Sequence, residues 1–344
     1  MAALPLSPRV VRAAVNSPLT RLLAGKAPKN DRGERLDPQT HRMLALQEQL
    51  GQPRLDELGP TVARPHFVQE VRLVDLPPVP LHRVEDRSIE SPRGAMRVRI
   101  YRPRARREPQ PALVYYHGGG FVVGDVDSHD GLCRHIAHRS GLTILSVDYA
   151  LAPEHPFPAA YDDAVLAFRW IVDHAEELVI DPARLAVGGD SAGGNLSAEV
   201  CLALRGDPGP CPAFQLLIYP ATDMTRSMES HQHLGSGYLL ERETVDWFLA
   251  NYLVRNEDKT DPRASPLSVA DLSDLPPAHV VLAGFDPLRD EGEAYAMALM
   301  AAGVPTTLRC YGSLVHGFAN MGGLVDAARF ALDDIADVLR DALS

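Results

Sequence analysis

The chain has 344 residues, 45% of them hydrophobic, and a formal net charge of −11. This length and apolar content are enough for one large core, or for two small ones. The acidic balance excludes a broad basic surface for nucleic acid and disfavours anionic substrates, so we expect no nucleic-acid partner.

The first 30 residues form a basic arm. They contain no acidic residue and five basic ones, namely Arg9, Arg12, Arg21, Lys26 and Lys29. Pro5, Pro8 and Pro18 exclude a long helix there. We interpret this stretch as an arm that packs on the body or moves freely, and a segment for membrane contact or targeting is the alternative.

Two further features bear on location. The sequence has no run of about 18 apolar residues and no apolar core of a signal peptide, so we expect no stable membrane association. Its four cysteines form no CxxC pair and are interpreted as free thiols of a cytoplasmic protein, although a Cys201–Cys211 disulfide is left open.

The first predicted element is an amphipathic helix over residues 38–50. Asp37 is a suitable N-cap, Pro38 suits the first helical position, and Gly51 is a suitable stop. Residues 62–79 are rich in proline and are expected to wrap around a surface.

From residue 97 onward, short apolar segments alternate with helical ones. The expected strands are 97–102, 112–116, 143–147, 184–187, 214–219, 279–283 and 306–311. The expected helices are 129–140, 160–175, 191–205, 288–302 and 324–342. Short apolar strands of this kind are typical of a mostly parallel sheet covered by helices on both faces, which predicts one large α/β domain.

Two regions interrupt this alternation. One is the segment before residue 80, and the other is an insertion at about 224–261 that contains Tyr238, Leu239, Leu240, Trp247, Phe248 and Tyr252. We predict an arm with cap helices over 1–80 and a catalytic domain over 81–344. The insertion is expected to form a lid over a pocket, and simple coverage of the core is the alternative.

The strongest local motif is Gly189-Asp190-Ser191-Ala192-Gly193, between a predicted strand and a predicted helix. Strand, G-x-S-x-G and helix is the context of a nucleophile elbow, because glycines leave room for a sharp turn that projects the serine hydroxyl. Ser191 is therefore the predicted nucleophile.

A second motif, His117-Gly118-Gly119-Gly120, ends the strand at 112–116. Bare backbone N–H groups in such a loop can stabilise the oxyanion of a tetrahedral intermediate. We predict an oxyanion hole made by the N–H groups of Gly118, Gly119 and Ala192. His117 is interpreted as a structural hydrogen-bonding residue.

The base and the acid follow from chain order. Hydrolases of this type carry serine, then acid, then histidine. His316 follows the last predicted strand, and Asp286 follows the strand at 279–283. Asp290 is the rival acid, but it lies one helical turn further along and should point away. The predicted triad is Ser191, His316 and Asp286, which requires no metal and no organic cofactor.

The sequence resembles the hormone-sensitive-lipase-like family, or bacterial family IV, of α/β-hydrolase esterases. The resemblance begins near residue 37 and includes HGGGF at 117–121, DYALAPEHPFPAA at 148–160, YDD at 161–163, GDSAGGN at 189–195, YP at 219–220, DPLRDEG at 286–292 and HGF at 316–318. It implies the α/β-hydrolase fold, with about eight mostly parallel strands and a helical cap. It also implies cleavage of short- to medium-chain acyl esters and a homodimer. Ala150 stands where the family often has Arg, and the N-terminus is longer than usual.

Other functions remain open at this point. An amidase, lactonase or carbamate hydrolase would use the same triad, and side chains alone do not separate them. A non-catalytic ligand receptor of this lineage would lack the histidine, which is present here as His316. A lipase for long-chain triglycerides would be expected to carry a signal or a long apolar surface segment.

Overall fold

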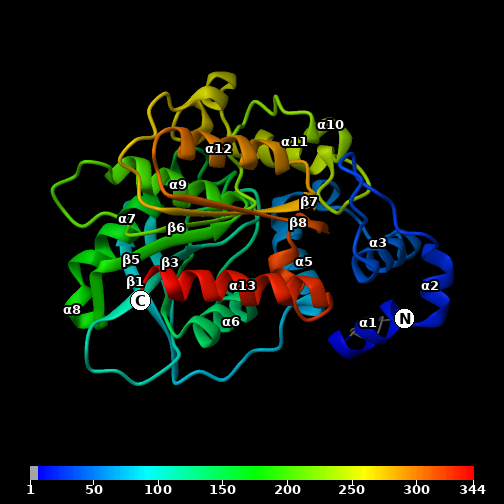
Figure 1. Cartoon of the computed structure of the whole chain (residues 1–344), viewed down its shortest axis with the longest axis horizontal. Coiled ribbons are helices and arrows are strands. Elements are labelled where there is room, and N and C mark those ends of the chain that lie inside the picture. Colours follow the sequence, from blue (N-terminus) through cyan, green and yellow to red (C-terminus); the bar gives the residue numbers. More distant parts are fainter. Residues whose placement is uncertain (1–6) are drawn as a thin grey trace.

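The computed structural model describes residues 7–344 and has an eight-stranded sheet at its centre (Figure 1). The strand order is β1-β2-β4-β3-β5-β6-β7-β8. Only the β1/β2 and β2/β4 pairs are antiparallel. The strands are β1 (Arg83–Ser91), β2 (Gly94–Arg102), β3 (Gln110–Tyr116), β4 (Thr143–Val147), β5 (Ile180–Asp190), β6 (Gln215–Ile218), β7 (Ala278–Phe285) and β8 (Thr306–Val315). The predicted α/β-hydrolase architecture is confirmed.

Strands that are buried on both faces are predicted from the sequence, and an exposed edge strand is not. Every residue of β4, β6 and β7 is buried, because helices cover both sides of these central strands. In contrast, β1 is an antiparallel edge strand in which only Ile89 is buried. Its polar sequence therefore gives no apolar signal, and this strand was not predicted.

Helices form a layer on each face of the sheet. One apolar core lies under α7, α9 and α12, and a second lies under α6 and α13. The helices are α6 (Asp130–Ser140), α7 (Ala159–Asp173), α8 (Ala175–Leu178), α9 (Ala192–Leu204), α12 (Arg289–Ala301) and α13 (Asp326–Ala342). Their bounds lie close to those that the apolar periodicity predicts.

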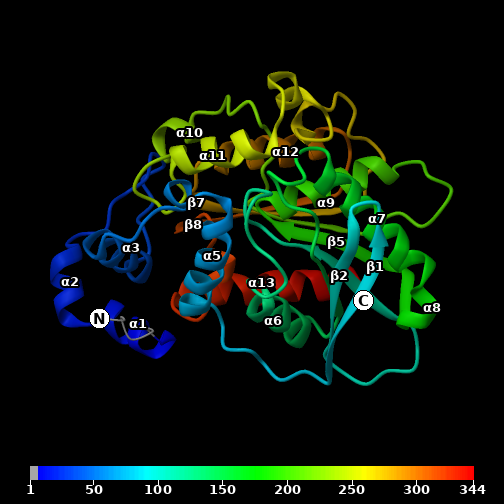
Figure 2. The same ribbon diagram turned by 180° about the vertical axis from the view of Figure 1, so that it is seen from behind.

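The remaining helices come from the two regions outside the alternation. The N-terminal segment contains α1 (Pro8–Val15), α2 (Pro18–Ala24), α3 (Pro38–Leu50), α4 (Leu55–Leu58) and α5 (Pro60–Val74). The insertion between β6 and β7 contains α10 (Ser230–His233) and α11 (Arg242–Tyr252). Helices α4 and α11 pack against each other, so the two regions meet beside the sheet (Figure 2).

Local chemistry sets the ends of the N-terminal helices. The Asp37 carboxylate accepts the N–H groups of Gln39 and Thr40 at 2.8 and 2.9 Å, and Gly51 ends α3 in the left-handed conformation with φ 59°. Pro8 and Pro18 occupy first turns, so the basic arm forms two short helices. The N-terminal Pro5 lies outside the described residues.

Most of the proline-rich stretch 62–79 belongs to helix α5, which the sequence did not predict. Pro60 begins the helix, where its missing N–H has no helical partner in any case. Pro65 removes only one hydrogen bond near the start of the helix. Burial of Ala63 and Val71 against the body offsets that loss, which local sequence does not reveal.

All four cysteines are free thiols, and Cys133 and Cys201 are buried. The disulfide that the sequence left open, Cys201–Cys211, is therefore absent. No helix within residues 7–344 has the length and apolar character needed to span a membrane.

Candidate active site

Ser191 lies in the sharp turn between β5 and α9. Its backbone is strained, with φ 56° and ψ −116°, a conformation that non-glycine residues rarely adopt. A Cβ atom at Gly189 or Gly193 would collide with the carbonyl oxygen of Tyr116 on the neighbouring strand. The two glycines are thus required by close packing, and the turn holds the Ser191 hydroxyl above the carboxyl end of the sheet.

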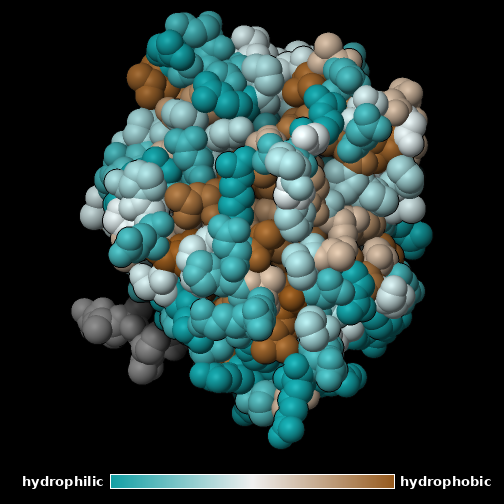
Figure 3. All heavy atoms as spheres, turned by 90° about the vertical axis from the view of Figure 1, so that its left-hand side faces the viewer, coloured by the Kyte–Doolittle hydropathy of each residue, from teal (hydrophilic) through white to brown (hydrophobic). Residues whose placement is uncertain are grey.

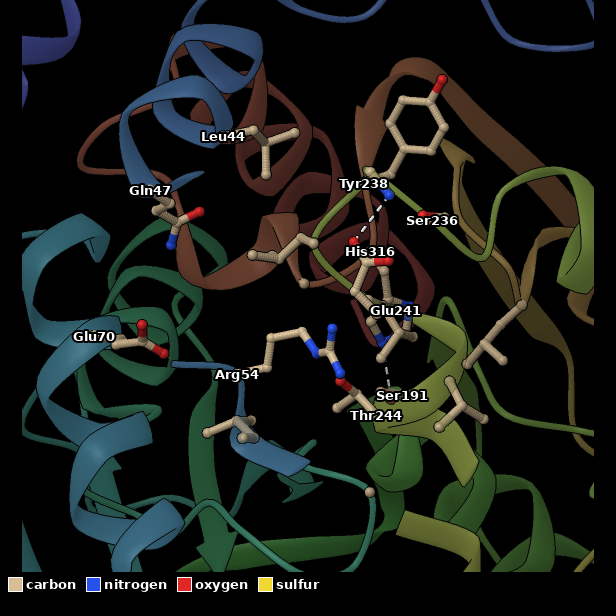
Figure 4. A pocket seen from close by; sticks show the side chains of 18 of the residues that line it. Leu44, Gln47, Arg54, Glu70, Ser191, Ser236, Tyr238, Glu241, Thr244 and His316 are labelled. Atoms are coloured by element: carbon tan, nitrogen blue, oxygen red, sulfur yellow. Dashed lines mark hydrogen bonds between the residues drawn. The ribbon is translucent and has the colours of Figure 1, made fainter. Parts of the chain in front are cut away.

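The structure brings Ser191, His316 and Asp286 together from the ends of three parallel strands. The Nε2 atom of His316 lies 3.0 Å from the Oγ atom of Ser191 (Figure 4). The Nδ1 atom of His316 lies 2.8 Å from the Oδ2 atom of Asp286. The other carboxylate oxygen of Asp286, which is fully buried, accepts the N–H of Leu288 at 2.8 Å.

These contacts fix which proton can move. With Asp286 accepting from Nδ1–H, the Nε2 atom of His316 is left to accept the proton of the Ser191 hydroxyl. A buried carboxylate beside an imidazole also stabilises the imidazolium that such a transfer creates. The arrangement can therefore activate Ser191 for attack on an acyl carbon.

Asp290 points away from His316, in the direction expected from its position one turn further along. Its carboxylate accepts from the Nε atom of Arg289 at 2.8 Å and from the backbone N–H of Ser230 at 3.0 Å. Neither contact involves a residue of the triad. Asp286 is the acid that reaches the histidine.

The prediction for Gly118 is wrong. Its N–H donates to the Oδ1 atom of Asp190 at 2.9 Å and is not available to a substrate. The N–H groups of Gly119 and Gly120 make no hydrogen bond to a described residue, and both glycines line the cavity next to Ser191. Ala192 is the first residue of α9, so its N–H has no partner within the helix. The free donors are therefore those of Gly119, Gly120 and Ala192.

Asp190 is a supporting residue that the sequence analysis did not assign. It is buried and accepts from the Tyr115 hydroxyl at 2.6 Å, and the Nε2 atom of His129 lies 3.3 Å from it. Burial by itself would raise the pKa of the Asp190 carboxyl, but His129, Tyr115 and the N–H of Gly118 lower it below its usual value. An acid before the nucleophile is the only signal in the sequence, and its partners come from distant segments.

His117 has a structural role, as expected. Its Nδ1 atom lies 2.8 Å from the carbonyl oxygen of Gly118, and its ring stacks on Tyr149 with 4.3 Å between centroids. Burial lowers the pKa of His117 to about 4, so this side chain is neutral near pH 7. It shapes the glycine loop and does not reach Ser191.

A cavity of about 940 Å³ opens above these groups. We call Gly119, Gly120, Ser191, Asp286 and His316 the floor, and helices α3–α5, α10 and α11 with the loops between them the roof. Figure 4 shows Leu44, Gln47 and Glu70 of the N-terminal helices facing Tyr238 and Glu241 of the insertion across the cavity. Apolar residues of the roof that line it include Met43, Leu44, Phe67, Val71, Leu240 and Phe248.

Two apolar side chains of the roof are directed away from the cavity. Leu46 and Trp247 are partly buried side chains that pack against the two apolar cores and do not line the cavity. Tyr252 of the insertion is also in the core, where its ring stacks on Phe121 with 3.8 Å between centroids. The insertion therefore contributes residues both to the lining of the pocket and to the packing around the glycine loop.

Few polar groups join the two halves of the roof. The Thr244 hydroxyl of α11 donates to the Oδ1 atom of Asp56 in α4 at 2.6 Å, and Arg54 donates to the same carboxylate at 2.8 Å. Burial raises the pKa of Glu70, and His66 partly offsets this. The roof thus combines apolar side chains with polar ones such as Gln47 and Glu70, and within residues 7–344 its two halves share one hydrogen-bonded connection.

Comparison with known proteins agrees with this geometry. A family model described as α/β hydrolase fold matches residues 113–320. The carboxylic ester hydrolase LipN of Mycobacterium tuberculosis is 44% identical over 338 residues, which cover 96% of this chain and 89% of that protein. The ethyl acetate hydrolase of Pseudomonas putida is 43% identical over 250 residues, which cover 72% of this chain and 78% of that protein.

A solved structure shows the same likeness in three dimensions. An ester-hydrolase from the metagenome of Lake Arreo, crystallised with a bipyridine phosphonate derivative, superimposes with a TM-score of 0.85 and 43% identity. The match covers 89% of this chain and 98% of that one. Because the family model spans more than half of the chain and the LipN match spans nearly all of it, the chain belongs to the hormone-sensitive-lipase-like family of α/β-hydrolases.

Proposed function

We propose that this chain is a serine carboxylesterase that hydrolyses small-molecule esters with short to medium acyl chains. The observation that carries the proposal is the continuous hydrogen-bonded series Ser191–His316–Asp286 at the floor of a cavity with mainly apolar walls. The similarity to a carboxylic ester hydrolase and an ethyl acetate hydrolase supports the reaction class.

In the proposed mechanism, the Nε2 atom of His316 takes the proton of the Ser191 hydroxyl as Oγ attacks the ester carbonyl. Asp286 holds the imidazole and stabilises its positive charge. The N–H groups of Gly119, Gly120 and Ala192 stabilise the oxyanion, and each such donor typically contributes about 100- to 1000-fold in rate. His316 then protonates the leaving alkoxide, and a water molecule attacks the acyl-enzyme by the same route in reverse.

We further propose that residues 1–80 and about 224–261 act together as the cap of a catalytic domain over 81–344. Each methylene buried in an apolar pocket contributes about 0.8 kcal/mol, so turnover should rise with acyl length until the chain meets the roof. Leu44, Phe67 and Phe248 line the cavity from different helices and would set this limit.

The alternatives on the same triad are hydrolysis of amides, lactones or carbamates, since these share the acyl-enzyme. No contact in the cavity favours them over esters. A non-catalytic receptor is disfavoured because His316 is present and lies within hydrogen-bonding distance of Ser191.

The test is kcat/KM for a series of p-nitrophenyl esters from acetate to palmitate, with p-nitroanilides in parallel. We expect an optimum at short to medium acyl chains and little cleavage of the anilides. Ser191→Ala should abolish turnover while the circular dichroism spectrum is unchanged, and an organophosphate should label Ser191 alone. Retained turnover in this variant, or a preference for palmitate, would contradict the proposal.

A further inference from the structure

The basic arm carries an apolar surface that no described residue covers. Leu19, Leu22 and Leu23 of α2 are 64%, 79% and 52% exposed, and Val10 of α1 is 52% exposed. Leucines exposed to this degree on one seven-residue helix differ from the single exposed apolar residues that are normal on protein surfaces. Within residues 7–344, nothing covers this face.

The charge of the same arm is opposite to that of the rest of the protein. Residues 1–30 contain five basic and no acidic side chains, in a chain whose net charge is −11. Arg12 donates to Asp326 of the body at 2.9 Å and anchors the arm. The other four, Arg9, Arg21, Lys26 and Lys29, are exposed and pair with no carboxylate in residues 7–344.

The arm is held in place and presents this face in a fixed orientation. Helix α1 packs on α3 and α5, and α2 packs on α3. Val15 is fully buried, and the Thr20 hydroxyl donates to the carbonyl oxygen of Ala14 at 2.7 Å. The apolar side chains that attach the arm are therefore separate from the leucines that point outward.

The exposed face also adjoins the cavity above Ser191. Leu23 and Ala24 line the same cavity as Ser191. In Figures 1 and 2, α1 and α2 lie at the end of the molecule farthest from α8. Figure 3 shows that the opposite end is mainly hydrophilic, with apolar residues in small separate areas. Exposed leucines and free cations thus coincide at the end of the molecule where α2 contributes to the lining of the cavity.

We propose that α1 and α2 dock reversibly on an anionic lipid surface, with the leucines in the acyl boundary and the free cations at the headgroups. An anionic bilayer accepts leucines and cations side by side, whereas a second copy of this chain would need an apolar hollow for Leu19 and Leu22 next to carboxylates. A few leucines and a few cations each contribute little binding free energy to a membrane, so the docking is reversible. Resting on the proposed esterase function, the docking delivers lipid-dissolved esters to Ser191.

The first test measures co-sedimentation of the full chain with vesicles of phosphatidylcholine containing phosphatidylglycerol, and with vesicles of phosphatidylcholine alone. We expect binding to the anionic vesicles that weakens as salt is raised. The double variants Leu19→Ser/Leu22→Ser and Arg21→Glu/Lys26→Glu should each weaken it by about tenfold or more. None of these four residues lines the cavity.

Two control variants make the same kinds of substitution at exposed positions outside the arm. Val254→Ser/Met297→Ser removes two exposed apolar side chains elsewhere. Arg104→Glu/Arg106→Glu makes the same change in net charge in the exposed loop before β3. This loop lies at the α8 end of the molecule, because the first residue of β3 is hydrogen-bonded to the residue that follows α8. Both controls should bind like the wild type. Equal losses in the controls, or a wild-type chain that stays in solution with both vesicles, would overturn the proposal.

The second test compares a vesicle-borne ester with water-soluble p-nitrophenyl acetate. Leu19→Ser/Leu22→Ser should lower kcat/KM about tenfold for the vesicle-borne ester alone. Absence of acetate turnover in the wild type would instead refute the esterase function and leave the docking result standing. Light scattering tests the alternative that the leucines bind a second copy of the chain. If the wild type is a dimer, the leucine variant is a monomer and the variant still binds vesicles like the wild type, the arm is a contact between copies and the proposal is wrong.

Discussion

The floor and the roof of the cavity are built in different ways. On the floor, Asp286 is fully buried, His316 is 8% exposed, and hydrogen bonds of 2.8 and 3.0 Å connect them to each other and to Ser191. In the roof, half-buried apolar side chains predominate, and Asp56 with Thr244 provides the polar connection described above between its halves.

This difference corresponds to two kinds of demand. Proton transfer and oxyanion stabilisation depend on donors and acceptors placed to within about 0.5 Å, so the floor is fixed by strain, glycine contacts and buried hydrogen bonds. Recognition of an acyl chain depends on apolar area and volume, which many side chains can supply. Substitutions should therefore abolish turnover at the floor and change selectivity at the roof.

The largest expected effect is at the acid of the floor. Asp286→Asn would leave the Ser191–His316 pair in place but favour the wrong imidazole tautomer, and a loss of kcat of about 10,000-fold is the precedent in a serine protease. Asp290→Asn is the matched control and should retain most of the activity, because its carboxylate faces Arg289 and Ser230. Steady-state kinetics decide the assignment, which is wrong if the control is the more damaged enzyme.

The next effect concerns the glycine loop. A Cβ atom in Gly119→Ala would collide with the carbonyl oxygen of Val123 at a backbone φ of 118°. The displaced N–H should lower kcat by about 100- to 1000-fold with a small change in KM. Gly303→Ala has a comparable positive φ of 83° but open space around its Cβ atom, and it should cost only about 1 kcal/mol of stability. Normal kcat in Gly119→Ala would exclude this loop from the oxyanion hole.

A smaller effect is expected in the roof. Leu44→Trp adds bulk inside the cavity and should shift the acyl optimum toward acetate, with a loss of about tenfold for octanoate and little change for acetate. Leu50→Trp adds the same bulk at the exposed end of the same helix and should leave the profile unchanged. If Leu44→Trp lowered kcat for all esters equally, the roof would take part in the chemistry, and the contrast with the floor would fail.

The smallest effect on turnover is expected at the junction after α5, where Asp75 accepts the N–H of Leu76 at 2.6 Å. Burial raises the pKa of Asp75 to about 7, from a usual value of 3.8. Between about pH 4 and pH 7 the unfolded chain loses this proton first, so stability falls as pH rises and then levels off. Asp75→Asn should remove this fall.

The measurement is chemical denaturation of both proteins at pH 4, 6 and 8. Relative to the wild type, Asp75→Asn should gain on the order of 4 kcal/mol between the lowest and highest pH, with unchanged kcat. Glu90→Gln, at an exposed position of β1, is the control and should show no such gain. A constant difference at all three pH values would mean that Asp75 is ionised throughout.

The sequence by itself determined the chemistry and most of the sheet. Continuous apolar runs predict β4, β6 and β7 because buried parallel strands have no polar side, and chain order predicts Ser191, Asp286 and His316 because each follows a strand. Both inferences depend on neighbours within a few residues. The polar edge strand β1 and the proline-containing helix α5 were missed because pairing and burial against distant segments stabilise them.

Only the tertiary structure decided which groups are free to act. Gly118 is equivalent to its neighbours in the sequence, yet its N–H is occupied by Asp190, more than 70 residues away, which leaves Gly119 and Gly120 as donors. Leu44 lines the cavity while Leu46 packs into the core, although both lie on the same helix. Hydrogen-bond occupancy and side-chain direction depend on contacts between segments far apart in the chain, so local pattern predicts which residue types are needed and three-dimensional packing selects among them.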